Sequence, residues 1–180
     1  FIDSDLSSWN MCAKSLDKAF KTYLPKAVIV TDIYGQSANY KDLEDICSKY
    51  RVPIIEDSAE SLGAEYYKKK CGSFGEISII SFNGNKIITT SGGGMILSNN
   101  EDYIKKAKKL STQAREKKLH YEHVELGYNY RMSNILAALG LAQLNSLDDY
   151  VIKTRKIFQT YKENLKNINE IEFMPEIKGG

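Results

Sequence analysis

Apolar and polar positions follow two different periods in the first third of the chain. Residues 27–31 form a short, β-branched, uninterrupted apolar run, which is typical of a strand buried on both faces. Residues 40–50 place apolar side chains among charges at the i, i+3, i+4 spacing of a helix. Residues 52–57 predict a second strand. Strand, helix and strand in this order predict a βαβ unit with a right-handed crossover.

Further along, two more apolar runs, residues 77–82 and 94–98, predict a third and a fourth strand. Residues 101–110 predict a helix. Residues 112–131 are polar and aromatic with little periodicity, so we expect a long functional loop there. These elements predict the α/β class.

The last part of the chain has a strong helical pattern that begins after Ser133, a suitable N-cap, and continues with a break to about Asn167. We therefore expect residues 1–132 to belong to one α/β domain and residues 133–180 to form a long helix that leads out of it.

Both ends of the chain suggest that it is a piece of a longer polypeptide. Residues 1–3 resemble the inside of a strand, and residues 176–180 resemble the start of a loop. The chain does not begin with methionine. We therefore expect further segments on both sides.

Composition narrows the class of protein. The chain is 42% hydrophobic and 27% charged, as in a soluble globular protein, and its net charge of +2 does not favour nucleic-acid binding. Its three cysteines have no CxxC or metal-like spacing, which predicts reduced thiols, a cytoplasmic location and no metal site. No apolar run approaches the roughly 20 residues that span a bilayer, so no membrane role is expected.

The segment from Ser81 to Met95 carries the most specific chemistry, because it places Lys86 between a predicted strand and the glycine run 92–94. A lysine amine can form a Schiff base with a carbonyl group. Taken alone, however, such a lysine is usually a surface group, and a glycine run is often only a flexible turn.

Asp57 strengthens the case for a site. It ends a predicted parallel strand, and ligands of open α/β sheets bind outside the carboxyl ends of strands. The alternative is that Asp57 only caps the next turn. Read together, Asp57, Ser81 and Lys86 fit a pyridoxal 5'-phosphate (PLP) site, where an acid pairs with the pyridinium nitrogen, a hydroxyl binds phosphate and an amine holds the aldehyde.

Three segments carry a family resemblance: residues 56–64 (EDSAESLGA), 81–95 and 127–132 (GYNYRM). In this order they resemble the signatures of the DegT/DnrJ/EryC1/StrS sugar aminotransferases, and the turn at residues 33–36 is also similar. The resemblance implies the large domain of a fold type I PLP-transferase, aspartate aminotransferase-like, with a mostly parallel sheet and flanking helices, truncated at both ends. Residues 133–180 then lead toward a small C-terminal domain.

The resemblance also implies roles near the cofactor. Lys86 is expected to bind PLP covalently and to act as the proton-shuttling base, and Asp57 to pair with the ring nitrogen. Ala59 is expected to pack against the ring, Glu60 to lie near the 3-hydroxyl, and Ser81 to bind the phosphate. For Glu60 and Ser81, a solvated helix residue and an ordinary strand-end hydroxyl remain the alternatives.

Two further residues are expected to act across a dimer. Asn129 is expected to reach the phosphate of the partner's cofactor in a homodimer with a shared active site. Arg131 is expected at the interface or at the substrate. A turn residue and a structural salt bridge are the respective alternatives.

The implied reaction is amino transfer, with glutamate as the expected donor, onto a keto carbon of a nucleotide-linked deoxysugar in bacterial glycan biosynthesis. The resemblance is strongest to nucleotide-sugar 4-aminotransferases of the UDP-bacillosamine type. Relatives with histidine in place of the lysine are sugar dehydratases, so Lys86 favours transamination. A catalytically incomplete fragment or partner subunit is the second hypothesis. A plain nucleotide-binding domain is the third, although neither GxGxxG after a strand nor GxxxxGK[ST] is present.

Overall fold

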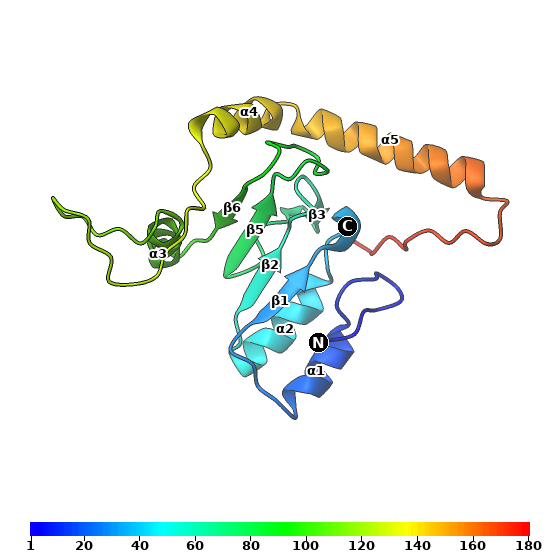
Figure 1. Ribbon diagram of the computed structural model, residues 1–180. Helices are drawn as coiled ribbons and strands as arrows, with labels where there is room; N and C mark the ends of the chain where they lie inside the picture. The colour runs from blue at the N-terminus through cyan, green and yellow to red at the C-terminus, as the bar shows by residue number, and fades with distance from the viewer.

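The computed structural model describes residues 1–180 and contains a four-stranded sheet with helices around it (Figure 1). The strand order is β1-β2-β5-β6. The first three strands are mutually parallel neighbours, and β6 is antiparallel to β5. The strands are β1 (Val28–Thr31), β2 (Ile54–Asp57), β5 (Ile77–Ser81) and β6 (Gly94–Leu97). All four predicted strands and the α/β class are confirmed.

The helix between β1 and β2, α2 (Tyr40–Tyr50), has the predicted bounds. The Asn39 side chain caps its first turn by accepting from the Asp42 N–H, and Arg51 ends it in the left-handed conformation. The turn before α2 contains the 3-10 helix η1 (Ile33–Gly35).

Two elements were not predicted. The helix α1 (Ala13–Phe20) has only eight residues. The hairpin of β3 (Glu65–Tyr66) and β4 (Lys69–Lys70) turns through Tyr67 and Lys68, whose φ values are 48° and 66°. Asn-Gly or Asp-Gly normally marks such a turn, and neither dipeptide is present there.

Helices α1 and α2 pack together on one face of the sheet, where the core includes Val28, Val30 and Ile54. Alternate residues point to the opposite face. Ile29 on that face is 62% exposed, so the prediction that residues 27–31 are buried on both faces is wrong for this chain. The reason is that both helices lie on the same side.

The expected strand at residues 1–3 is also absent. Only Ser4 forms an isolated bridge, to Met11. The chain turns back on itself there instead of pairing with the sheet, because the N–H of Cys12 donates to the carbonyl of Asp3 at 2.9 Å.

The C-terminal part contains α4 (Asn134–Leu144) and α5 (Leu147–Leu165). The break between them and the N-cap at Ser133, which accepts from the Leu136 N–H, were predicted. In Figure 1 both helices run past one end of the sheet. Gln143 of α4 anchors them by bonding to both the N–H and the C=O of Thr89.

Beyond β6 lies α3 (Glu101–Ser111), followed by the irregular segment 112–131 (Figure 1). Isolated bridges join Thr112 to Asn129 and Arg115 to His123 in that segment. Across the whole chain, no helix combines the length and the apolar character that crossing a membrane requires.

Candidate active site

Four of the predicted site residues surround one cavity of about 220 Å³. They come from the turn after β2 and from the segment that begins at the last residue of β5. The cavity is lined by Ala59, Glu60, Ser81 and Lys86, together with Tyr34, Leu62, Asn85 and Ile87.

Lys86 is held at this cavity by the loop that carries it. Phe82 and Ile88 on either side of it are buried, and the N–H of Thr90 bonds to the carbonyl of Phe82 at 2.9 Å, which closes the loop. The Lys86 side chain is only 16% exposed. The loop therefore directs the amine inward, unlike that of a typical surface lysine.

The Lys86 amine faces the carboxylate of Glu60, with 3.3 Å between Nζ and Oε1. The other oxygen of Glu60, Oε2, accepts from the backbone N–H of Tyr34 at 2.7 Å. Glu60 lies in a turn and its side chain is 35% exposed, so the alternative of a solvated helix residue is wrong only about the helix. This carboxylate joins η1 to Lys86.

Ser81 presents a free donor to the cavity. Its oxygen accepts from the N–H of Asn83 at 3.3 Å, and its O–H donates to no protein group. A hydroxyl with an uncommitted proton can bind an oxyanion such as a phosphate.

Asp57 is the last residue of β2, as predicted, but it is not part of the cavity lining. Its partner across the β2–β5 pair is Ile79, two residues before Ser81, so Asp57 and Ser81 lie on the same face of the sheet. Asp57 also accepts from the N–H of Ala59 at 3.2 Å. Asp57 thus caps the following turn and also occupies a position that suits a ligand.

Asn129 and Arg131 lie elsewhere. They line a larger, open hollow of about 1030 Å³ formed by the end of α3 and the segment after it, which shares no lining residue with the Lys86 cavity. Arg131 forms no ion pair, so the interpretation as a structural salt bridge is not supported. A single chain does not bring these two residues to Lys86.

The glycine run has a packing explanation. Gly93 has a φ of 91°, and a Cβ on Gly94 would lie 2.6 Å from the carbonyl oxygen of Ile80. Gly94 therefore permits the close approach of β5 and β6 instead of facing the cavity.

Sequence reasoning missed Tyr34 as a wall of the cavity. Its φ of 55° is unusual for a non-glycine residue, and its side chain is 72% exposed. The turn at residues 33–36 was noted for its family resemblance, but its position beside Glu60 depends on tertiary contacts.

The cavity offers donors that PLP would use. Its volume of about 220 Å³ lies below the roughly 300–1,000 Å³ of pockets that enclose drug-sized ligands. An amine, a free hydroxyl and a small alanine side chain meet there. These groups match the aldehyde, the phosphate and the ring face of the cofactor.

A sequence model of the DegT/DnrJ/EryC1/StrS aminotransferase family matches residues 1–179. The chain belongs to this family. It is 52% identical over 185 aligned residues to the putative pyridoxal phosphate-dependent aminotransferase EpsN of Bacillus subtilis (strain 168). That alignment covers 100% of this chain and 48% of the relative. It is 36% identical to GDP-perosamine synthase of Escherichia coli O157:H7, over 95% of the chain and 47% of that protein.

Solved structures give the same result for the fold. A DegT/DnrJ/EryC1/StrS aminotransferase from Brucella abortus superposes with a TM-score of 0.86 at 30% identity, over 100% of this chain and 49% of that one. Helicobacter pylori PseC, an aminotransferase of pseudoaminic acid biosynthesis, superposes with a TM-score of 0.86 at 29% identity. That superposition covers 94% of this chain and 46% of the PseC chain. The predicted fold class is confirmed. The chain spans about half the length of the curated relatives it matches.

Proposed function

We propose that the full-length protein is a PLP-dependent aminotransferase that transfers an amino group, with glutamate as donor, to a keto carbon of a nucleotide-linked deoxysugar for bacterial glycan synthesis. The observation that carries the proposal is the inward-facing Lys86 amine, held in a cavity lined by family-motif residues. The family membership and the names of relatives such as GDP-perosamine synthase support it.

In this proposal the residues of the cavity, together with Asp57 at the end of β2, bind and orient PLP. Lys86 holds the aldehyde carbon, Ser81 donates to the phosphate, and Ala59 leaves room for the ring. Asp57 pairs with the ring nitrogen, and Glu60 lies beside the 3-hydroxyl. When bound, PLP supplies the electron sink for amino transfer.

Lys86 also moves the proton at the carbon that gains the amino group. Proton transfer requires an amine that alternates between its charged and neutral forms. The Glu60 carboxylate, 3.3 Å away, orients this amine.

The second part of the proposal is a homodimer. Asn129 and Arg131 line a separate hollow of their own chain. In this proposal they therefore act at the Lys86 cavity of a second copy of the chain. We include residues 133–180 as the connection to a small C-terminal domain. A cytoplasmic location is supported by the three cysteines, all of which are free.

The test is amino transfer by the purified full-length protein with PLP, glutamate and a UDP-linked 4-keto-6-deoxysugar. The expected product is the 4-amino sugar, and Lys86→Ala is expected to abolish its formation. Dehydration of the sugar in place of amination supports the PLP-family dehydratase. Failure to bind PLP supports the incomplete-subunit hypothesis.

A further inference from the structure

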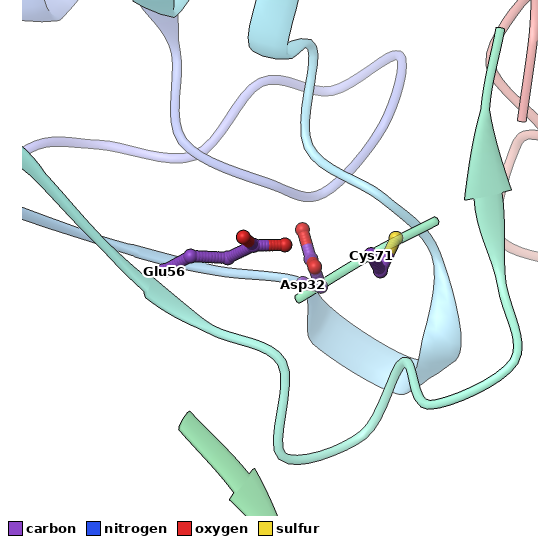
Figure 2. A group of neighbouring side chains, drawn as sticks. All are labelled: Asp32, Glu56 and Cys71. Atoms are coloured by element: carbon purple, nitrogen blue, oxygen red, sulfur yellow. The ribbon is translucent and has the colours of Figure 1, made fainter. Parts of the chain in front are cut away.

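A second group of polar side chains lies on the opposite side of β2 from Asp57. Asp32 follows β1, and Glu56 is the neighbour of Asp57, so its side chain points to the face that the helices cover. Both carboxylates are fully buried. Figure 2 shows Asp32 between Glu56 and the thiol of Cys71.

Every carboxylate oxygen in this group accepts hydrogen bonds from the protein. The Glu56 oxygens accept from the N–H groups of Gly72, Phe74 and Gly75 and from the hydroxyls of Ser58 and Ser78. The donor hydrogens occupy the positions that a cation would need. The group is therefore an internal hydrogen-bonded network and not a metal site. We call this network, centred on Asp32 and Glu56, the bracket.

Asp32 connects two turns that form the cavity. Its Oδ1 accepts from the N–H of Ala38 at 2.8 Å and from the hydroxyl of Tyr40 at 2.9 Å, which shapes the turn containing η1. Its Oδ2 accepts from the hydroxyl of Ser61 at 2.8 Å. Asp32 immediately precedes η1, and Ser61 immediately follows Glu60.

The bond between Asp32 and Ser61 runs beside the bond from the Tyr34 N–H to Glu60. Both bonds join the same two turns. The first is buried and the second lies at the cavity, where the Glu60 side chain is 35% exposed. The buried bond is the more durable one, because water does not compete for its partners.

We propose that Asp32 is a positioning residue of the candidate active site: through Ser61 it fixes the turn that holds the Glu60 carboxylate against the Lys86 amine. Asp32 itself touches neither Lys86 nor the cavity. The relevance of this bracket to catalysis depends on the proposed function, but its effect on Lys86 does not.

A serine substitution in this network is small and has a matched control variant. Ser61→Ala removes the hydroxyl that bonds to Asp32. Ser78→Ala removes a hydroxyl that bonds to Glu56 at 2.8 Å and contacts neither turn. Both serines are 1% exposed, so the two variants lose similar buried hydrogen bonds, each worth about 1 kcal/mol. Glu60→Gln removes the negative charge that Lys86 faces, and its effect is the reference for the other variants.

The experiment measures the rate at which acetic anhydride acetylates Lys86 in the full-length protein without PLP, followed by mass spectrometry of the peptide. Loss of an ion pair of this partly exposed kind changes such a rate about threefold. We expect about a threefold rise for Glu60→Gln, at least half of that rise for Ser61→Ala, and no change for Ser78→Ala. Equal rates in the Ser61 and Ser78 variants overturn the proposal.

A second pair of variants tests Asp32 directly. Asp32→Asn keeps an oxygen for the Ala38 N–H and places an amide that can donate to the Ser61 oxygen, so the Lys86 rate should remain close to wild type. Asp32→Ala should raise that rate to the Ser61→Ala level. A rise in Asp32→Asn that matches Asp32→Ala contradicts the positioning role.

These rates need neither cofactor nor substrate. A protein without amino transfer but with the expected Lys86 rates refutes the proposed function and leaves the bracket intact. A protein with amino transfer and unchanged rates in Ser61→Ala refutes only the bracket.

Discussion

Asp32 makes the stability of the protein depend on pH in a direction that can be stated from the structure. Burial raises the pKa of the Asp32 carboxyl from 3.8 to about 6, although hydrogen bonds from Ala38, Ser61 and Tyr40 favour the charged form. The nearby charge of Glu56 raises this pKa further. The Cys71 thiol does not oppose this effect, because burial raises its own pKa to about 12 and keeps it neutral.

The magnitude follows from the difference between the folded and unfolded states. A rise from 3.8 to about 6 corresponds to about 3 kcal/mol at 1.36 kcal/mol per pKa unit. Because the folded pKa is the higher one, the contribution of Asp32 to stability is fully present below about pH 4 and is lost as the pH rises through about 6. The charged carboxylate is thus a net cost at neutral pH.

Asp32→Asn removes this dependence. Asparagine has a similar shape and does not titrate, so the stability of the variant relative to wild type should increase by about 2.5 kcal/mol between pH 4 and pH 7, most of the full difference. The assay is urea unfolding of both proteins, followed by circular dichroism, at a series of pH values. The exposed Asp3→Asn is the control and should show no such change.

A difference between wild type and Asp32→Asn that stays constant from pH 4 to pH 7 would mean that the pKa of Asp32 is not raised in the folded protein. That result would mean that the hydrogen bonds from Ala38, Ser61 and Tyr40 fully offset the burial of the charge.

Two further predictions concern the shared site and the sheet. If the active site is shared, full-length Lys86→Ala and Asn129→Ala should each be inactive alone. Co-expression of the two variants should restore about a quarter of the wild-type sites, because half of randomly mixed dimers are heterodimers and each heterodimer has one intact site. No recovery of amino transfer in the mixed sample argues against a shared site. Gly94→Ala should lower the free energy of unfolding by about 2 kcal/mol, because its Cβ would lie 2.6 Å from a β5 carbonyl oxygen. Gly84→Ala, whose Cβ meets nothing within 4 Å, should be close to neutral, and urea unfolding distinguishes the two.

The strands and α2 could be predicted because their signals are local. The bounds of α2 follow from its apolar spacing, and β1 and β2 follow from short β-branched runs. The burial of residues 27–31 could not be predicted, since it depends on both helices packing on one face of the sheet.

The candidate site could be predicted only in part, for a similar reason. Lys86 and Ser81 lie close together in the sequence, and the strand-end position of Asp57 follows from its apolar run. The pairing of Lys86 with Glu60 joins residues 26 positions apart in the sequence, and the contact from Tyr34 depends on a turn stabilised by buried Asp32. Such contacts have no periodic signature.

Reductive trapping shows whether Lys86 binds the cofactor in the full-length protein. The protein is incubated with PLP, reduced with borohydride, digested and analysed by mass spectrometry. A phosphopyridoxyl adduct on Lys86, absent in Lys86→Ala, is the expected result. An unmodified Lys86 peptide, or an adduct confined to another lysine, means that Lys86 does not carry the cofactor.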